Sequence, residues 1–178
     1  MQNEYQLKLD WRGFQLHPEI PPGGADTAAL FGAARAEHMA ARMQAFAADF
    51  GVTMGLPTRV PFTLRPLAAT EFARDHGQLA PFREHLMDVH WLHGGDIEAD
   101  DELAAAAKAV GLDADDVLAA ADDHVYRERL HDIRRQAFDN MITAIPTFVF
   151  GGYPVIGCQS YETLTKVATK LGIPRREV

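Results

Sequence analysis

The stretch that decides the fold runs from Ala144 to Leu164 and reads AIPTFVFGGYPVIGCQSYETL. Within it, Thr147–Phe150 is a β-branched and aromatic run, which favours a strand. Gly151 and Gly152 form a two-residue hairpin signal, and the return strand follows over Tyr153–Ile156. Ser160 then caps an amphipathic helix. The stretch therefore predicts a β-hairpin followed by a helix.

Upstream of this hairpin, the pattern is helical from Asp26 to about Gln136. Asp26 and Asp113 are N-cap residues, while prolines in first turns and glycines after last turns divide the region into separate helices. We expect these helices to share one core, built on Leu30, Phe46, Phe72, Phe82, Leu86, Val89, Leu103, Val110, Leu118 and Leu130.

The first residues of the chain have a different pattern. Apolar and polar residues alternate over Tyr5–Leu16, which predicts a strand with one buried face. The run from His17 to Gly24 holds three prolines and two glycines, so it favours an ordered crossover loop. The order is thus strand, helical block, strand, strand, helix.

Composition limits the function classes. The chain has 178 residues, 47% apolar and 24% charged, with a formal net charge of −8. This charge excludes nucleic acid and anionic membrane surfaces as partners, because both need a basic face. Residues 1–10 lack a secretory signal, and no apolar run is long enough to span a bilayer. A single cysteine cannot form an intrachain disulfide, and we expect a cytoplasmic protein.

The element order and these residues resemble the FrnE-like branch of the DsbA family of thiol-disulfide oxidoreductases. The resemblance covers nearly the whole chain. It is carried by a strand and crossover, two helical lid segments, a cis-proline loop with its strand, and a strand exit: residues 11–21, 39–51, 80–96, 144–150 and 155–159.

The resemblance implies an α/β, thioredoxin-like (DsbA-like) fold, in which a mixed sheet carries a large all-α insertion. Residues 1–25 and 137–178 would form an incomplete thioredoxin-like domain, and residues 26–136 an inserted helical domain. The family opens with a strand, a C-x-x-C motif and a helix, whereas four residues precede Tyr5 here and Cys158 is the one cysteine. We therefore expect the N-terminal βα unit to be missing, through a native loss, a start upstream of Met1, or truncation.

The missing unit has two expected consequences. Without a second cysteine, a mixed disulfide cannot be resolved, so we expect no two-cysteine redox cycle and assign no catalytic residue. Open strand edges favour association, so we expect a homo-oligomer, namely a dimer with its sheet completed across chains.

The resemblance also implies where a substrate binds. Ala144, Ile145, Pro146 and Thr147 are the expected substrate-binding residues; the peptide bond before Pro146 is expected to be cis, with the backbone of Ile145 pairing with an extended substrate. Cys158 is a candidate reactive thiol because it precedes a helix start, although an unpaired cysteine is more often a packed apolar residue. Further candidates line a groove under the lid: His17, Pro18, His90 and Trp91.

Metal and cofactor sites are not expected. His85, His90 and His93 have no cysteine or carboxylate pattern to complete a site. The expected partners are an extended peptide or a small thiol, and a second copy of the chain. Two alternatives remain open: a non-enzymatic binding or assembly module, and a relative of the glutathione-dependent isomerases and kappa-class transferases.

Overall fold

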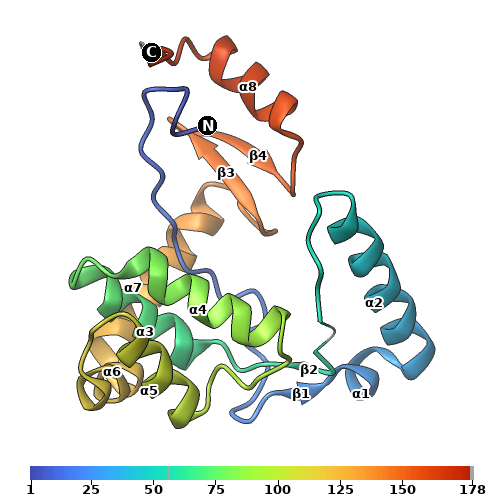
Figure 1. Cartoon of the computed structure of the whole chain (residues 1–178), viewed down its shortest axis with the longest axis vertical. Helices are drawn as coiled ribbons and strands as arrows, with labels where there is room; N and C mark the ends of the chain where they lie inside the picture. Colours follow the sequence, from blue (N-terminus) through green and yellow to red (C-terminus); the bar gives the residue numbers. More distant parts are fainter. Residues whose placement is uncertain (56, 177–178) are drawn as a thin grey trace. The chain divides into compact units, whose positions relative to one another are not determined.

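The structure is a computed structural model that describes residues 1–55 and 57–176 (Figure 1). Leu56, in the predicted inserted domain, and residues 177–178, at the end of the predicted thioredoxin-like domain, lie outside the described residues. Among the described helices, none is long and apolar enough to cross a membrane.

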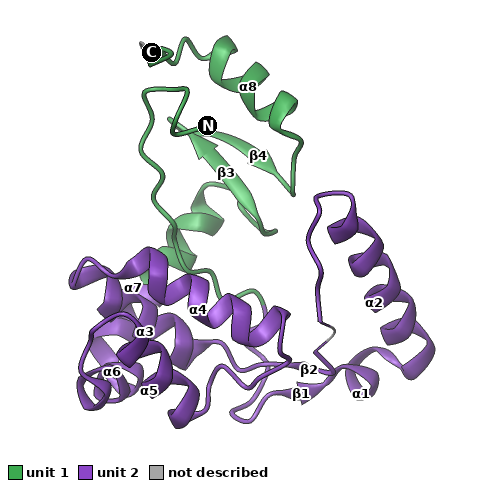
Figure 2. Cartoon of the chain, viewed as in Figure 1, with its two compact units in different colours: residues 1–16, 132–178 green, residues 17–131 purple. Residues whose placement is uncertain are grey.

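The chain divides into two compact units (Figure 2). Unit 1 holds residues 1–16 and 132–178, and unit 2 holds residues 17–131. The division into an incomplete thioredoxin-like domain (1–25 with 137–178) and an inserted domain (26–136) stays a prediction about independently folding parts.

Unit 2 is mostly helical. Its elements are β1 (Ala25–Asp26), α1 (Thr27–Phe31), α2 (Ala33–Ala48), β2 (Arg59–Val60), α3 (Leu64–Asp75), α4 (Leu79–Trp91), α5 (Asp100–Ala109), α6 (Ala114–Asp122) and the first half of α7 (His124–Asp139). β1 and β2 pair antiparallel through Ala25 with Val60 and Asp26 with Arg59.

Several predicted helix starts are confirmed. The Asp26 side chain accepts a hydrogen bond from the amide of Ala29 at 2.8 Å. Asp113 does the same for α6, accepting from the amide of Asp115 at 2.9 Å. These carboxylates satisfy backbone amides that a helix start leaves without an intrahelical partner.

The core of unit 2 lies among α3, α4, α5 and α6. Phe82 and Leu103 are its largest apolar side chains with full burial, and alanines fill much of the rest: Ala69, Ala73, Ala106, Ala107 and Ala121. Small side chains let helix backbones approach closely, so a few large residues can fill the remaining space. The predicted core residues Phe82, Leu86, Val89, Leu103 and Leu130 are confirmed as buried, while Phe72, Val110 and Leu118 pack partly buried against this core.

Two predicted core residues are wrong. Leu30 is 44% exposed and Phe46 is 48% exposed. The predicted first helix is divided at Gly32, whose φ of 85° lies outside the helical region. The resulting α2 has an apolar side, as its spacing indicates, and unit 2 leaves the large side chains on that side partly exposed.

Ion pairs join α3 to later helices of unit 2. Glu71 is 1% exposed and accepts from Nε of Arg74 at 3.0 Å. Arg129 lies 3.6 Å from Glu71 and donates to both oxygens of Asp75, at 2.8 and 2.9 Å. This hydrogen-bonded pairing holds the pKa of Asp75 below its usual range. Ion pairs therefore link α3 to α7.

Unit 1 contains β3 (Thr147–Phe150), β4 (Tyr153–Ile156) and α8 (Tyr161–Lys170). The predicted hairpin is confirmed, with Thr147 paired to Ile156 and Phe150 to Tyr153. Gly151 and Gly152 both have positive φ, 54° and 95°, as a tight hairpin turn requires. Ser160 caps α8 by accepting from the amide of Thr163 at 3.1 Å.

The predicted strand over Tyr5–Leu16 is wrong. Of the described residues there, Tyr5 alone has a β-partner, Arg175. Tyr5 is 1% exposed, and the Arg175 guanidinium lies 5.3 Å from its ring centroid. Alternation reports which side of a segment is buried, whereas a strand also needs a neighbouring backbone to pair with. The Gln6 amide still donates to the Pro174 carbonyl oxygen at 2.8 Å, but residues 7–16 form no ladder with another strand.

Candidate functional site

The predicted substrate loop lies between the end of α7 and the start of β3, within unit 1. Met141 adopts a left-handed φ of 59° just after α7. The amide of Ile142 then donates to the carbonyl oxygen of Ala137 at 2.8 Å. This C-terminal cap reverses the chain and delivers Ala144–Pro146 to the first residue of β3.

Hydrogen bonds fix the loop to both strands of the hairpin. The Thr147 hydroxyl donates to the Ala144 carbonyl oxygen at 2.6 Å. The Gly157 amide donates to the Pro146 carbonyl oxygen at 2.7 Å, and the Ile145–Pro146 peptide bond is cis. The loop is therefore held against the exit of β4.

Ile145 differs from its neighbours because its backbone amide and carbonyl have no hydrogen-bond partner among the described residues. Its residue surface is 49% exposed. Within residues 1–55 and 57–176, no hydrogen bond joins its backbone amide or carbonyl to another group. Backbone polar groups normally find a partner in protein or water. Ile145 thus offers a donor and an acceptor to the surroundings.

Cys158 follows Gly157 directly, so the fold brings it near the substrate loop. The thiol is free and exposed, and it lies two residues before the α8 cap, Ser160. The interpretation of Cys158 as a packed apolar residue is wrong, because the residue is exposed. Its reactivity stays a prediction.

The four predicted groove residues all lie in unit 2. His17 and Pro18 are exposed, and His17 Nδ1 pairs with a Glu19 carboxylate oxygen at 2.9 Å. His90 and Trp91 end α4 with their ring centroids 4.6 Å apart. A groove that these residues share with Ala144–Thr147 stays a prediction.

His90 borders a small cavity that the sequence did not reveal. Its lining includes Arg59, Asp96 and Glu98, and its volume is about 60 Å³. Glu98, 7% exposed, accepts from the amides of Gly23 at 3.0 Å and Phe62 at 3.3 Å. Glu98 thereby ties two loops together, a role hidden by its place in an acidic run typical of solvated helix faces.

The polar groups around this cavity stabilise the fold and do not form a ligand site. Burial lowers the pKa of His90, against the opposing effects of a hydrogen bond to the Gly95 backbone and of the Asp96 carboxylate. A volume of this size lies far below the roughly 300 Å³ of typical small-molecule sites. Among the described residues, no group of three or more histidine, cysteine, aspartate or glutamate side chains is placed to hold a metal ion.

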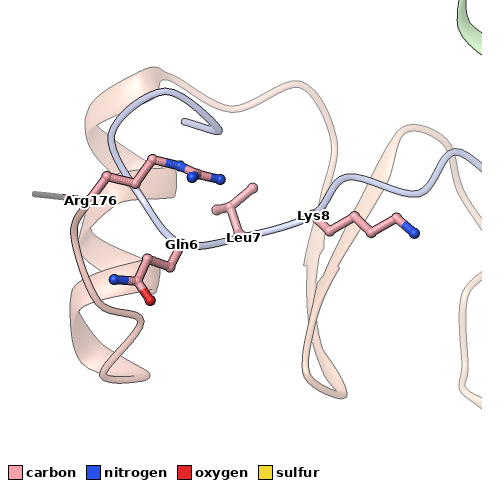
Figure 3. Close-up of a pocket in the computed structure, with 4 residues that line it drawn as sticks. All are labelled: Gln6, Leu7, Lys8 and Arg176. Carbon is pink, nitrogen blue, oxygen red and sulfur yellow. The ribbon is translucent and has the colours of Figure 1, made fainter.

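A wider hollow lies in unit 1, lined by Gln6, Leu7, Lys8 and Arg176 (Figure 3). Arg176 Nε donates to the carbonyl oxygens of Gln2 at 2.8 Å and Tyr5 at 3.2 Å, so it fastens the two chain ends. Figure 3 shows Lys8 extending away from Arg176. Because its cations do not converge, this hollow does not define a ligand site.

The comparisons with known proteins decide the family. The family model described as DSBA-like thioredoxin domain matches residues 1–168. The chain belongs to the DSBA-like thioredoxin domain family. A search of curated protein sequences finds no match.

Two solved structures similar to this DSBA-like chain confirm the fold class. A probable DsbA oxidoreductase from Streptomyces coelicolor has a TM-score of 0.78 at 22% identity, over 94% of this chain and 77% of that one. A 2-hydroxychromene-2-carboxylate isomerase has a TM-score of 0.69 at 13% identity, over 92% of this chain and 79% of that one. At these identities the similarity carries the fold alone. The isomerase alternative accordingly stays a prediction.

Proposed function

We propose that this DSBA-like chain binds an extended peptide or a small thiol compound at the Ala144–Thr147 loop, without turning over disulfides itself. The FrnE-like assignment belongs to the same proposal. The observation that carries it is the backbone of Ile145, which has no hydrogen-bond partner among the described residues in a residue that is 49% exposed. Its free amide and carbonyl are the groups that a bound extended segment would pair with.

The neighbouring hairpin supports this mode of binding. β3 pairs with β4, and its other edge has no strand partner among the described residues. A peptide that pairs with Ile145 could continue along this edge as an added strand. Thr147 and the Gly157–Pro146 hydrogen bond hold the loop in place, so the binding groups are set before the ligand arrives.

The absence of disulfide turnover is proposed from the chemistry of Cys158. A thiol can attack a disulfide to give a mixed disulfide, and a second thiol must then release the product. This chain has one cysteine. Its exposed thiol can form the first adduct, but no neighbouring thiol of the chain can resolve it.

Binding is tested by titrating the 15N-labelled chain with a reduced, cysteine-containing peptide of about eight residues, long enough to extend along a short strand. Ile145→Pro removes the amide donor, whereas the matched control Ile145→Ala keeps it. We expect Ile145→Pro to weaken binding about 5- to 10-fold relative to Ile145→Ala, the effect of one lost hydrogen bond. Equal affinities in two folded variants would refute pairing through Ile145.

Turnover is tested separately by insulin reduction with a reducing co-substrate. We expect no turnover by the wild-type chain. Turnover that persists in Cys158→Ser would reveal a redox route outside this account, and turnover that is lost in Cys158→Ser would show one-cysteine chemistry.

A further inference from the structure

Helix α2 carries an apolar stripe that unit 2 leaves uncovered. Met39, Met43, Phe46 and Phe50 are 38%, 39%, 48% and 51% exposed. Their spacing of four, three and four residues places them along one side of the helix. The Phe46 and Phe50 ring centroids lie 5.2 Å apart, so Phe50, just past the helix end, continues the stripe.

Small residues border the stripe on one flank of α2. Ala36 and Ala40 are half-buried there, and Ala47 is 6% exposed. The turn after the helix covers Ala47, because the amides of Phe50 and Val52 both donate to its carbonyl oxygen at 3.0 Å. Among the labelled elements, α2 packs mainly against α1, and Figure 2 shows both within unit 2. Ala36, Ala40 and Ala47 lie beside the stripe, roughly 70° from it around the helix, so small side chains border it.

We propose that the occupant of this stripe is α2 of a second copy of the chain, packed antiparallel. In one register, Met43 lies opposite Phe46 of the second copy, and Met39 lies opposite its Phe50. The two-fold axis then passes between Met43 and Phe46, and each contact occurs twice. Isologous contacts of this kind are the usual basis of dimers.

The local charge of α2 allows a second copy to pack here. The chain as a whole carries −8, which opposes self-association over most of its surface. Helix α2 with its C-cap is neutral, since Arg35 and Arg42 balance Glu37 and Asp49. The stripe therefore lies on a part of the molecule where two acidic copies can meet.

The same register also pairs opposite charges. Arg42 and Asp49 are seven residues apart, so both lie on one flank of the stripe, roughly 10 Å from each other along the helix. In the antiparallel pair, Arg42 of each copy lies beside Asp49 of the other. This arrangement gives two symmetric ion pairs that a single chain cannot form.

The first experiment measures the mass of the chain by sedimentation from 1 to 100 µM, a range suited to a small interface (about micromolar affinity). All variants carry Cys158→Ser to exclude disulfide-linked dimers. Phe46→Glu should raise the dissociation constant about 30-fold or more, the effect of losing a central apolar contact. Ala45→Glu adds the same charge on the opposite side of α2 and should leave the dimer intact.

The second experiment tests the register by exchanging charges. Arg42→Asp and Asp49→Arg should each weaken the dimer about 3- to 5-fold. The double variant restores both ion pairs across the two-fold axis and should return the dissociation constant to within about 2-fold of the parent.

Two results would overturn the proposal, and a third would reject only the register. A parent chain that stays monomeric at 100 µM would overturn the proposal, as would a dimer that survives Phe46→Glu, because its contact would then lie elsewhere, for example at the β3 edge. Additive weakening in the double variant would reject the antiparallel register. Circular dichroism of each variant verifies that α2 still folds.

Discussion

The α3–α6 core and helix α2 belong to the same unit and differ in what covers their apolar sides. Phe82 and Leu103, in the core, are fully buried. On α2, Met43 and Phe46 are 39% and 48% exposed. Both regions have the helical spacing of apolar residues that predicts burial. The difference teaches that spacing identifies the side of a helix to be buried, while the partner comes from tertiary or quaternary structure.

The largest expected effect comes from removing one phenylalanine from each region. Phe82→Ala should destabilise the chain by about 3–5 kcal/mol, because it removes a fully buried ring and leaves a cavity. Phe46→Ala, measured by urea denaturation below 1 µM chain, should cost under about 1 kcal/mol. Similar losses for both variants would mean that Phe46 is buried within its own chain.

Much of the fold can be read from local signals. Asp26, Asp113 and Ser160 have side chains that reach amides of their own helices, so caps depend only on neighbouring residues. The Gly151–Gly152 turn is likewise local, and it fixes the register of β3 with β4. Starts and turns of this kind could therefore be predicted from single positions.

Features that depend on residues far apart in the sequence could not be predicted in this way. The strand expected over Tyr5–Leu16 has the correct alternation, but a ladder also needs a neighbour that alternation does not supply. Leu30 and Phe46 illustrate the same limit for helices. In the candidate site, the Ile145 loop was predicted from the resemblance to a family and not from local signals. The Glu98 contacts could not be predicted, because they join loops that only the fold brings together.

Removing the charge of one glutamate in each region is expected to have an intermediate effect on stability. Glu71→Gln should destabilise the chain by about 1–2 kcal/mol, because the buried carboxylate accepts charge-assisted hydrogen bonds from Arg74. Glu37→Gln, at an exposed position on α2, is the matched control and should change stability by less than about 0.5 kcal/mol. Chemical denaturation at pH 7 measures both, and a loss from Glu37→Gln that equals that of Glu71→Gln would contradict the assignment.

The pH dependence gives a smaller effect. Burial lowers the pKa of His90 in the folded chain, so the unfolded chain binds the proton more tightly. This contribution to stability is complete above the ordinary histidine pKa of about 6.5 and decreases as pH falls below it, by at most about 1.4 kcal/mol per pH unit.

The corresponding measurement compares unfolding free energies at pH 7.5 and pH 5.5. His90→Gln should lose less stability over this interval than the wild type. His38→Gln, on the exposed surface of α2, is the control and should keep the wild-type dependence. If His90→Gln loses as much stability as the wild type between pH 7.5 and pH 5.5, then groups other than His90 cause the loss.

Hydrogen exchange at two protein concentrations, 1 and 100 µM, tests the contrast between the two regions most directly. We expect the amides of α3–α6 to be protected equally at both concentrations, since their core closes within one chain. The amides of α2 should exchange faster at 1 µM and gain protection at 100 µM, when a second copy covers Met43 and Phe46. Protection of α2 that equals that of α3–α6 at 1 µM would contradict the account.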